Sequence, residues 1–345
     1  MLDVYSAARP QAGGAPRNPH TQVVFDMQEL SVRVADKRRE AQDIVSLELV
    51  DAHGSSLPPF TAGAHIDVHL PGGLIRQYSL LNDCSERSRY RIGVLREARS
   101  RGGSVAMHDQ IRVGDVLRIS EPRNRFALQP APRSLLLAGG IGVTPILCMA
   151  RQLQAAGADF EFHYSCRTRA RAAFLDDILG SALAAHARLH FDDEPDTALD
   201  APALLAAAGP DTHVYVCGPA GFIDHVVAQA RAAGLEDARI HFERFAASEP
   251  VVPAQGDQPF QVRLASTGEV FDIPADEPVT KALDRHGVFI PVSCEEGICG
   301  TCLTGVVEGV PDHRDSYLTD DEHAANDQFT PCCSRSKTPM LVIDL

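Results

Sequence analysis

The stretch SCEEGICGTC, Ser293–Cys302, holds three of the nine cysteines in a chain of 345 residues. A chain of this length can bury a full apolar core without covalent staples, so disulfide scaffolding does not explain the concentration. The spacing is C-x4-C-x2-C, and the next cysteine follows after another 29 residues. This plant-type spacing predicts a [2Fe–2S] cluster bound by Cys294, Cys299, Cys302 and Cys332. The alternatives are a zinc site, which more usually shows paired C-x2-C knuckles, and unrelated buried thiols.

The chemistry of such a cluster accounts for the residues between the cysteines. A loop wrapped around two irons brings three thiolates to the metal while its amides point at the sulfurs. Gly297 and Gly300 let the backbone pass close without a side chain in the way. Four thiolates give the oxidised cluster a net negative charge, so we expect amide hydrogen bonds to help set its potential.

The composition is that of an ordinary globular protein, with 44% hydrophobic and 23% charged residues. At roughly 100 to 150 residues per domain, the length predicts two or three domains. The sequence lacks both a long uninterrupted apolar run and the apolar stretch of a secretory signal. We therefore expect a cytoplasmic protein without a membrane partner. Its leader, residues 1–26, is rich in Pro, Gly and Ala and is expected to be disordered.

The net charge of −14 is unevenly spread along the chain. Residues 256–345 contain 16 Asp or Glu against 6 Lys or Arg, whereas residues 27–130 contain 13 against 15. Phosphate contact needs a basic surface, so nucleic acid is not an expected partner. The acidic terminal block is instead suited to docking on a basic patch of a protein.

Three blocks follow the leader. Residues 27–130 contain short alternating runs such as QELSVRVADKR, IVSLELVD and AHIDVHL between turn signals, which predicts an antiparallel barrel or sandwich. Residues 131–246 alternate apolar strands with Ala-rich helical stretches, as in a parallel sheet covered by helices. A Pro-rich linker, residues 247–258, leads to the final block, residues 259–345, which opens with the hairpin-like FQVRLASTGEVFDIP.

The final block resembles a known ferredoxin domain in GVPDHRDSYLTDDE, CCSRS and the closing LVIDL. That domain is the carboxy-terminal one of the phthalate dioxygenase reductase and vanillate demethylase reductase family. Cys332 lies two residues before Ser334, as the family's fourth ligand does. Cys333 is then a spare packing thiol, pointing the opposite way if the segment is extended. The resemblance implies a multidomain chain with an antiparallel β-barrel flavin domain, a ferredoxin-reductase-like α/β nucleotide domain with a parallel sheet, and an α+β plant-type ferredoxin domain.

Two segments of the first block resemble the family's flavin site. In RQYSLLND, Arg76–Asp83, the resemblance places Arg76 at the flavin phosphate and Tyr78 and Ser79 beside the ring, with Leu80 as a further cofactor-binding candidate. Arginine suits a phosphate because its planar donors bind two oxygens at once. In RGGSVAMHD, a glycine turn with Gly102, Gly103 and Ser104 enters a short helix whose free amides favour an anion. The family uses FMN, and the resemblance alone favours FMN over FAD.

The second block carries two motifs similar to the nucleotide site of ferredoxin reductases. Strand SLLLA runs into GGIGVTP, a turn where pyrophosphate can approach the backbone, with candidate residues Gly139, Gly140, Gly142, Thr144 and Pro145. It is not G-x-G-x-x-G, which disfavours an ordinary Rossmann dehydrogenase. HVYVCGPAGF supplies the nicotinamide-side candidates Cys217, Gly218 and Pro219, and HFERF supplies the aromatic Phe245. Taken alone, Cys217 is equally a small buried thiol, and Phe245 a core residue.

The remaining candidates are weaker. His65 and His69 lie in a strand-like segment and are interpreted as structural or exposed, and no hydrolase motif is present. Arginines in RTRARAAF, near Arg167, could bind the 2′-phosphate of NADP, but family members with similar segments use NADH, which we expect here.

Together the three blocks describe a route from NADH through the flavin to the cluster, with no residue singled out as a catalytic acid or base. Neither a Rieske C-x-H pair nor a two-histidine, one-carboxylate site is apparent, so the substrate is expected to belong to a separate Rieske-type oxygenase. We expect a monomeric reductase component that serves this partner. The alternatives are a reductase for a cytochrome P450 and, in another class, a flavin and iron–sulfur redox sensor.

Overall fold

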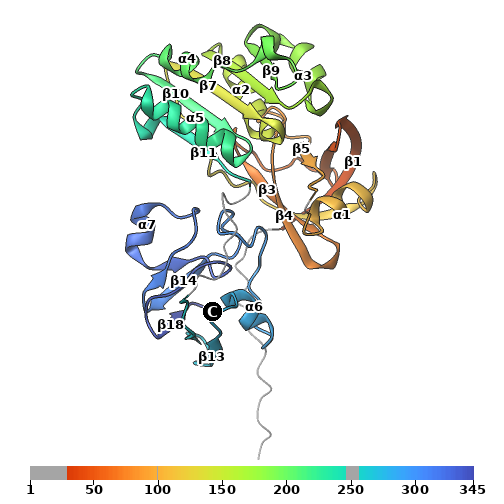
Figure 1. The fold of residues 1–345 in the computed structure, drawn as a ribbon. Helices are drawn as coiled ribbons and strands as arrows, with labels where there is room; N and C mark the ends of the chain where they lie inside the picture. Colours follow the sequence, from red (N-terminus) through yellow and green to blue (C-terminus); the bar gives the residue numbers. More distant parts are fainter. Residues whose placement is uncertain (1–28, 99, 246–255) are drawn as a thin grey trace, which may run out of the picture.

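The computed structural model describes residues 29–98, 100–245 and 256–345 (Figure 1). The expected leader, residues 1–26, and most of the expected linker, residues 247–258, lie outside the described residues. Within the described ranges, no helix has both the length and the apolar character needed to cross a membrane.

The first block is an antiparallel sheet closed into a barrel. Its strand order is β4-β3-β6-β1-β2-β5. A bridge between Leu80, just after β4, and Ile92 of β5 joins the two edge strands, so the sheet is a barrel rather than a sandwich. One short helix, α1 (Gly103–Asp109), lies on it. The strands are β1 (Glu29–Ala41), β2 (Ile44–Asp51), β3 (His65–Leu70), β4 (Leu74–Ser79), β5 (Tyr90–Leu95) and β6 (Val116–Ser120).

The second block is a parallel sheet with strand order β11-β10-β7-β8-β9. Its strands are β7 (Arg133–Gly139), β8 (Asp159–Cys166), β9 (Ala187–Phe191), β10 (Thr212–Cys217) and β11 (Ile240–Glu243), and its helices are α2 (Val143–Ala156), α3 (Leu175–Leu179), α4 (Ala201–Ala206) and α5 (Ala220–Ala232). Successive residues of β7 alternate between the faces: Leu136 packs with α2, whereas Leu135 packs with α4 and α5. The order of the chain reverses between β7 and β10, where ligands of such sheets usually bind.

The third block is a mixed sheet with strand order β13-β12-β18-β14-β16 and an added β15-β17 pair. The predicted hairpin forms β12 and β13, and the closing LVIDL contributes to the central strand β18. The elements are β12 (Phe260–Leu264), β13 (Val270–Ile273), α6 (Val279–Asp284), β14 (Thr304–Glu308), β15 (Pro311–Asp312), α7 (Asp320–Ala325), β16 (Gln328–Phe329), β17 (Arg335–Ser336) and β18 (Met340–Ile343). Figure 1 shows this blue domain below the barrel strands β3 and β4.

Short 3₁₀ turns complete the described chain: η1 (Pro71–Gly73), η2 (Gly140–Gly142), η3 (Arg169–Arg171), η4 (Ala182–Ala185), η5 (Pro195–Thr197) and η6 (Asp237–Arg239).

Candidate redox site

Four buried thiols gather at the cysteine-rich loop, those of Cys294, Cys299, Cys302 and Cys332. Cys294 contacts Cys299 and Cys332, and Cys332 also contacts Cys302. None of the four forms a disulfide. The sulfur of Cys294 accepts hydrogen bonds from the amides of Glu296 at 3.3 Å and Ile298 at 3.5 Å. Buried thiols with backbone amides directed at sulfur are the donor set that suits a [2Fe–2S] cluster.

Two glycines of the loop are required by its neighbours in the fold. Gly297 and Gly300 have φ values of +71° and +69°, which L side chains rarely adopt. A Cβ on Gly300 would lie 2.1 Å from the ring of Tyr317, and one on Gly297 would lie 2.5 Å from the sulfur of Cys333. The segments that carry Tyr317 and Cys333 therefore pack directly onto the loop, a contact that the sequence did not reveal.

The backbone at Cys333 differs from the extended segment that we assumed. Residues 331–333 form a turn, in which the amide of Cys333 donates to the Thr330 carbonyl oxygen at 3.1 Å. Pro331 lacks the amide hydrogen that would continue a strand. The thiol of Cys333 packs against the Thr330 hydroxyl at 3.3 Å and contacts Cys332, and Cys332 in turn contacts Cys294 and Cys302. The assumed conformation was wrong, but the contacts of Cys332 support the proposed ligand assignment.

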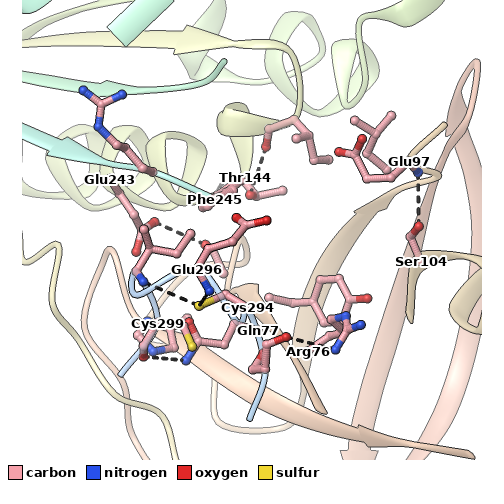
Figure 2. Close-up of a pocket in the computed structure, with 18 of the residues that line it drawn as sticks. Arg76, Gln77, Glu97, Ser104, Thr144, Glu243, Phe245, Cys294, Glu296 and Cys299 are labelled. Carbon is pink, nitrogen blue, oxygen red and sulfur yellow. Dashed lines mark hydrogen bonds between the residues drawn. The ribbon is translucent and has the colours of Figure 1, made fainter. Parts of the chain in front are cut away.

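A cavity of about 480 Å³ opens where the three domains meet (Figure 2). Its wall includes residues proposed from the sequence for the flavin, the nucleotide and the cluster: Arg76, Tyr78, Ser79, Ser104, Thr144, Phe245, Cys294 and Cys299. The other proposed residues lie outside this wall: Leu80, Gly102, Gly103, Gly139, Gly140, Gly142, Pro145, Cys217, Gly218, Pro219, Cys302 and Cys332. One cavity thus reaches from the flavin-type motif to two of the clustered cysteines.

One end of the cavity is basic. Arg76, on β4, donates to the Arg101 carbonyl oxygen at 3.0 Å. Burial and the charge of Arg101 lower the pKa of the Arg76 guanidinium. A Cβ on Gly103 would lie 2.5 Å from the Arg76 side chain, so the glycine allows α1 to approach it. The Arg76 guanidinium and the Ser104 hydroxyl fit a phosphate at this end, whereas Arg101 is paired with Glu296 at 2.6 Å.

The cysteine-rich loop contacts the flavin-type strand directly. Arg76 Nη1 donates to the Ser293 carbonyl oxygen and Gln77 Nε2 donates to the Cys299 carbonyl oxygen, each at 3.1 Å. Arg76 therefore links the phosphate end of the cavity to the first residue of the loop. Gln77, which was not among the predicted residues, links the same strand to a proposed ligand.

A family model and two relatives of known name are similar to this chain. Residues 262–337 match the model of the 2Fe-2S iron-sulfur cluster binding domain. The chain is 56% identical to vanillate O-demethylase oxidoreductase of Pseudomonas sp. (strain HR199 / DSM 7063), over 92% of this chain and 100% of that protein. It is 40% identical to phthalate dioxygenase reductase of Burkholderia cepacia, over 92% of this chain and 97% of that protein.

Comparison with solved structures finds a similar protein to that found by sequence. The solved phthalate dioxygenase reductase, described as a modular structure for electron transfer from pyridine nucleotides to [2Fe-2S], matches 92% of this chain and 98% of its own with a TM-score of 0.70. The chain belongs to the phthalate dioxygenase reductase family. An intact type IV self-sufficient cytochrome P450 monooxygenase also matches, at 36% identity and a TM-score of 0.80, over 96% of this chain and 43% of that one.

In this family member, the two glycine-rich turns pack against each other at the ends of β7 and β10. A Cβ on Gly142 would lie 2.3 Å from the Cys217 carbonyl oxygen, and one on Gly218 would lie 2.9 Å from the Gly139 Cα. Burial raises the pKa of the Cys217 thiol well above its usual range, so the group is neutral. These residues shape the switch point through the backbone, which is why they lie behind the cavity wall.

Glu243 is a residue of the reductase that the sequence analysis missed. It ends β11 inside HFERF and lines the cavity. The Ser79 hydroxyl donates to its carboxyl at 3.5 Å, and burial raises the pKa of Glu243 to about 8. A carboxyl group that keeps its proton near neutral pH can hold or release a proton there. Its signal in the sequence was a lone acid between aromatic residues at a strand end.

Two further residues of the wall refine the sequence interpretation. Phe245 is exposed rather than part of the core, so its ring is available to a ligand in the cavity. His65 is buried in the wall, where burial and the Arg123 charge lower its pKa to about 4. His65 is therefore a neutral structural residue, and His69, outside this wall, pairs with Glu29 at 3.5 Å.

Proposed function

We propose that this chain is the reductase component of a two-component Rieske non-haem iron oxygenase. Electrons would pass from NADH through FMN and the [2Fe–2S] cluster to the oxygenase. The observation that carries the proposal is the single cavity lined by both Arg76 and Tyr78 of the flavin-type motif and Cys294 and Cys299 of the cluster loop.

The flavin would accept two electrons as hydride and supply them singly to the cluster. Within this proposal, Arg76 holds the flavin phosphate, and Tyr78 and Phe245 orient the ring system. Ser79 and Glu243 hold a proton beside it. Arg76 and Gln77 fix the cluster loop against the flavin strand through its carbonyl groups. The role of the protein is to set the distance between the flavin and the cluster and the orientation of each.

NADH is favoured over NADPH because two of the three arginines in RTRARAAF, Arg169 and Arg171, are paired with carboxylates. Arg169 forms two hydrogen bonds with the Glu194 carboxylate, at 2.6 and 2.9 Å. Arg171 pairs with Asp43 at 3.6 Å. A 2′-phosphate at this position would have to displace these carboxylates and would meet their negative charge.

The name of the 56% identical relative supports an O-demethylating oxygenase as the partner. The structural likeness to a P450 monooxygenase favours a second candidate, a reductase that serves a cytochrome P450. In either case, the chain is proposed to act as a cytoplasmic monomer.

The test is anaerobic mixing of the purified protein with NADH, followed by addition of a purified oxygenase together with its substrate and O2. We expect the flavin absorbance to bleach first and the cluster absorbance second, and vanillate O-demethylase oxygenase to turn over only when the reductase is present. Turnover of a P450 but not of the Rieske oxygenase would favour the second candidate. Flavin bleaching without any reduction of the cluster would contradict both.

A further inference from the structure

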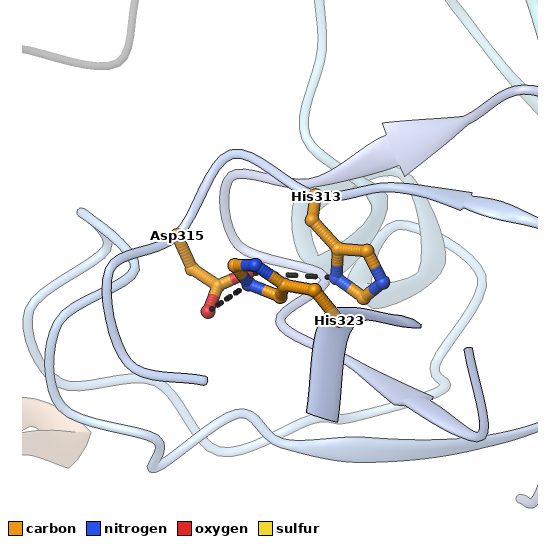
Figure 3. Close-up of side chains that lie close together, drawn as sticks. All are labelled: His313, Asp315 and His323. Carbon is orange, nitrogen blue, oxygen red and sulfur yellow. Dashed lines mark hydrogen bonds and ion pairs between the residues drawn. The ribbon is translucent and has the colours of Figure 1, made fainter. Parts of the chain in front are cut away.

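A second group of metal-binding side chains lies in the carboxy-terminal domain, beyond the cluster loop (Figure 3). His313 follows β15, Asp315 lies two residues later, and His323 is on α7. One ligand atom from each lies within 4.8 Å of the other two. This is the two-histidine, one-carboxylate combination that the sequence analysis did not find, because only the fold brings His323 back to the other two.

Each histidine has a nitrogen near the Asp315 carboxylate, and the two histidines face different oxygens of it. His323 Nε2 lies 3.3 Å from Asp315 Oδ2, and His313 Nδ1 lies 3.7 Å from Asp315 Oδ1. Ligand bonds of about 2.0 to 2.2 Å at tetrahedral angles place neighbouring ligand atoms about 3.3 to 3.6 Å apart. The two imidazole rings are stacked with centroids 4.4 Å apart, and one nitrogen of each lies within 4.8 Å of the other and of a carboxylate oxygen of Asp315.

His313 is the strongest indication of a ligand. Its side chain is only 8% exposed, and neither ring nitrogen has a hydrogen-bond partner among the described residues. The Asn326 side chain interacts with the ring, and its amide nitrogen donates to the Ala324 carbonyl oxygen at 2.9 Å. A buried imidazole with two unsatisfied nitrogens is costly, and a cation bound at Nδ1 would satisfy one of them.

The carboxylate is held in place for this role. Asp315 is fully buried and accepts hydrogen bonds from the Leu318 amide at 2.8 Å and the Ser334 hydroxyl at 3.4 Å. Such hydrogen bonds orient metal-ligating carboxylates. The neighbouring Ser316 amide donates to the Gly297 carbonyl oxygen at 3.0 Å, so the group lies directly behind the cysteine-rich loop.

We propose that His313, Asp315 and His323 bind one divalent first-row transition cation of the Zn²⁺ type, with water completing its coordination. Two imidazoles and a carboxylate select such an ion over Mg²⁺ or Ca²⁺, which take oxygen ligands. The bound ion braces the segment 313–323 against the cluster loop. This proposal does not depend on the electron route proposed above.

The experiment uses full-length protein with its flavin and iron contents measured, titrated anaerobically with ZnCl₂ by calorimetry. We expect one Zn²⁺ per chain with no loss of iron, and X-ray absorption at the zinc edge showing nitrogen and oxygen ligands without sulfur. His323→Ala removes a side chain that is 26% exposed and should weaken binding at least about tenfold, while the flavin and iron contents stay those of the wild type. His286→Ala, an exposed histidine of the same domain, should bind like the wild type.

Three results would overturn the proposal. These are no binding up to about 1 mM Zn²⁺, equal affinity in His323→Ala and the wild type, and sulfur ligation with release of iron. The last would show that the cluster cysteines had taken the zinc, and the iron measurement separates it from the first two.

Discussion

The flavin barrel meets the nucleotide domain and the carboxy-terminal domain through different kinds of contact. One hydrophobic core runs from the barrel into the nucleotide domain and includes Leu117 of β6 and Ile146 of α2. The carboxy-terminal domain has a separate core, and it meets the barrel through polar contacts such as Arg76 with Ser293 and a stacking of Arg125 over Tyr317 at 4.7 Å. A shared apolar core makes two domains fold as one unit, whereas a polar border leaves a module that can be removed. The difference indicates a fused flavin and nucleotide unit with an attached cluster module.

Removal of the cluster module is the largest test of this difference. A chain ending near Ala254 should remain yellow and reduce ferricyanide with NADH, because its core is complete without the third domain. It should fail to reduce cytochrome c or an oxygenase, because the exit through the cluster is gone. The measurements are flavin content and the two NADH-dependent rates. Loss of flavin and of ferricyanide reduction would show that the polar border is essential to the fold.

Within the module, the adjacent cysteines offer a matched pair. Cys332→Ala should abolish or strongly destabilise the cluster, because it removes the thiol that contacts Cys294 and Cys302. Cys333→Ala should cost only packing against Thr330 and Gly297. Iron content and visible absorbance, with the flavin as internal standard, are compared between the two purified variants. A lost cluster in Cys333→Ala together with a normal one in Cys332→Ala would reverse the assignment.

The two sides of the molecule also differ in how much the sequence predicted. The alternation of residues predicted the barrel strands, the parallel sheet and the hairpin of the third domain, because these patterns depend only on local burial. The cysteine spacing predicted four thiols that the fold does gather. Closure of the barrel through Leu80 and Ile92, and the contact of Gln77 with the cluster loop, join residues far apart in sequence. Such long-range pairs leave no periodic signal in a single sequence.

The same limit explains the missed titratable groups. Glu243 is unremarkable in HFERF, and its raised pKa results from burial by elements that the strand meets only in the folded chain. His313 and His323 were not recognised as neighbours because the turn into α7 could not be placed beforehand. Cys333 was assigned an extended backbone, although Pro331 beside it favours a turn.

An effect of intermediate size is expected in the fused flavin and nucleotide unit, where the ionisation of Glu243 should change the rate of flavin reduction. Its pKa near 8 lies above the usual value of 4.5, so the folded state holds the proton more tightly than the unfolded chain does. The stability that this contributes is fully present below pH 4.5 and is lost as the pH rises towards 8. The rate of flavin reduction by NADH should fall several-fold through pH 8, where a negative charge forms beside the ring, and should be nearly flat in Glu243→Gln. The measurement is the stopped-flow rate of flavin reduction on both sides of pH 8, with the exposed Glu236→Gln as control. If the rate of Glu243→Gln falls through pH 8 as that of the wild type does, another group is responsible for the fall.

The smallest expected effect is that of salt on two electron-transfer rates, from the flavin to the cluster within the chain and from the cluster to the oxygenase. Residues 256–345 carry 16 acidic against 6 basic side chains, and some of these charges are used internally, as in the pair of Glu296 with Arg101 at 2.6 Å. Such partly exposed pairs are worth only about 0 to 1 kcal/mol, so transfer from the flavin to the cluster within one chain should change little with salt. Transfer from the cluster to the oxygenase depends on encounter and should slow as salt screens the remaining acidic surface, with a Debye length of about 8 Å near physiological ionic strength. Both steps can be followed by rapid mixing over the same salt series. If the internal step slows as much as the external one, salt separates the module from the barrel, and the acidic surface does not steer the partner.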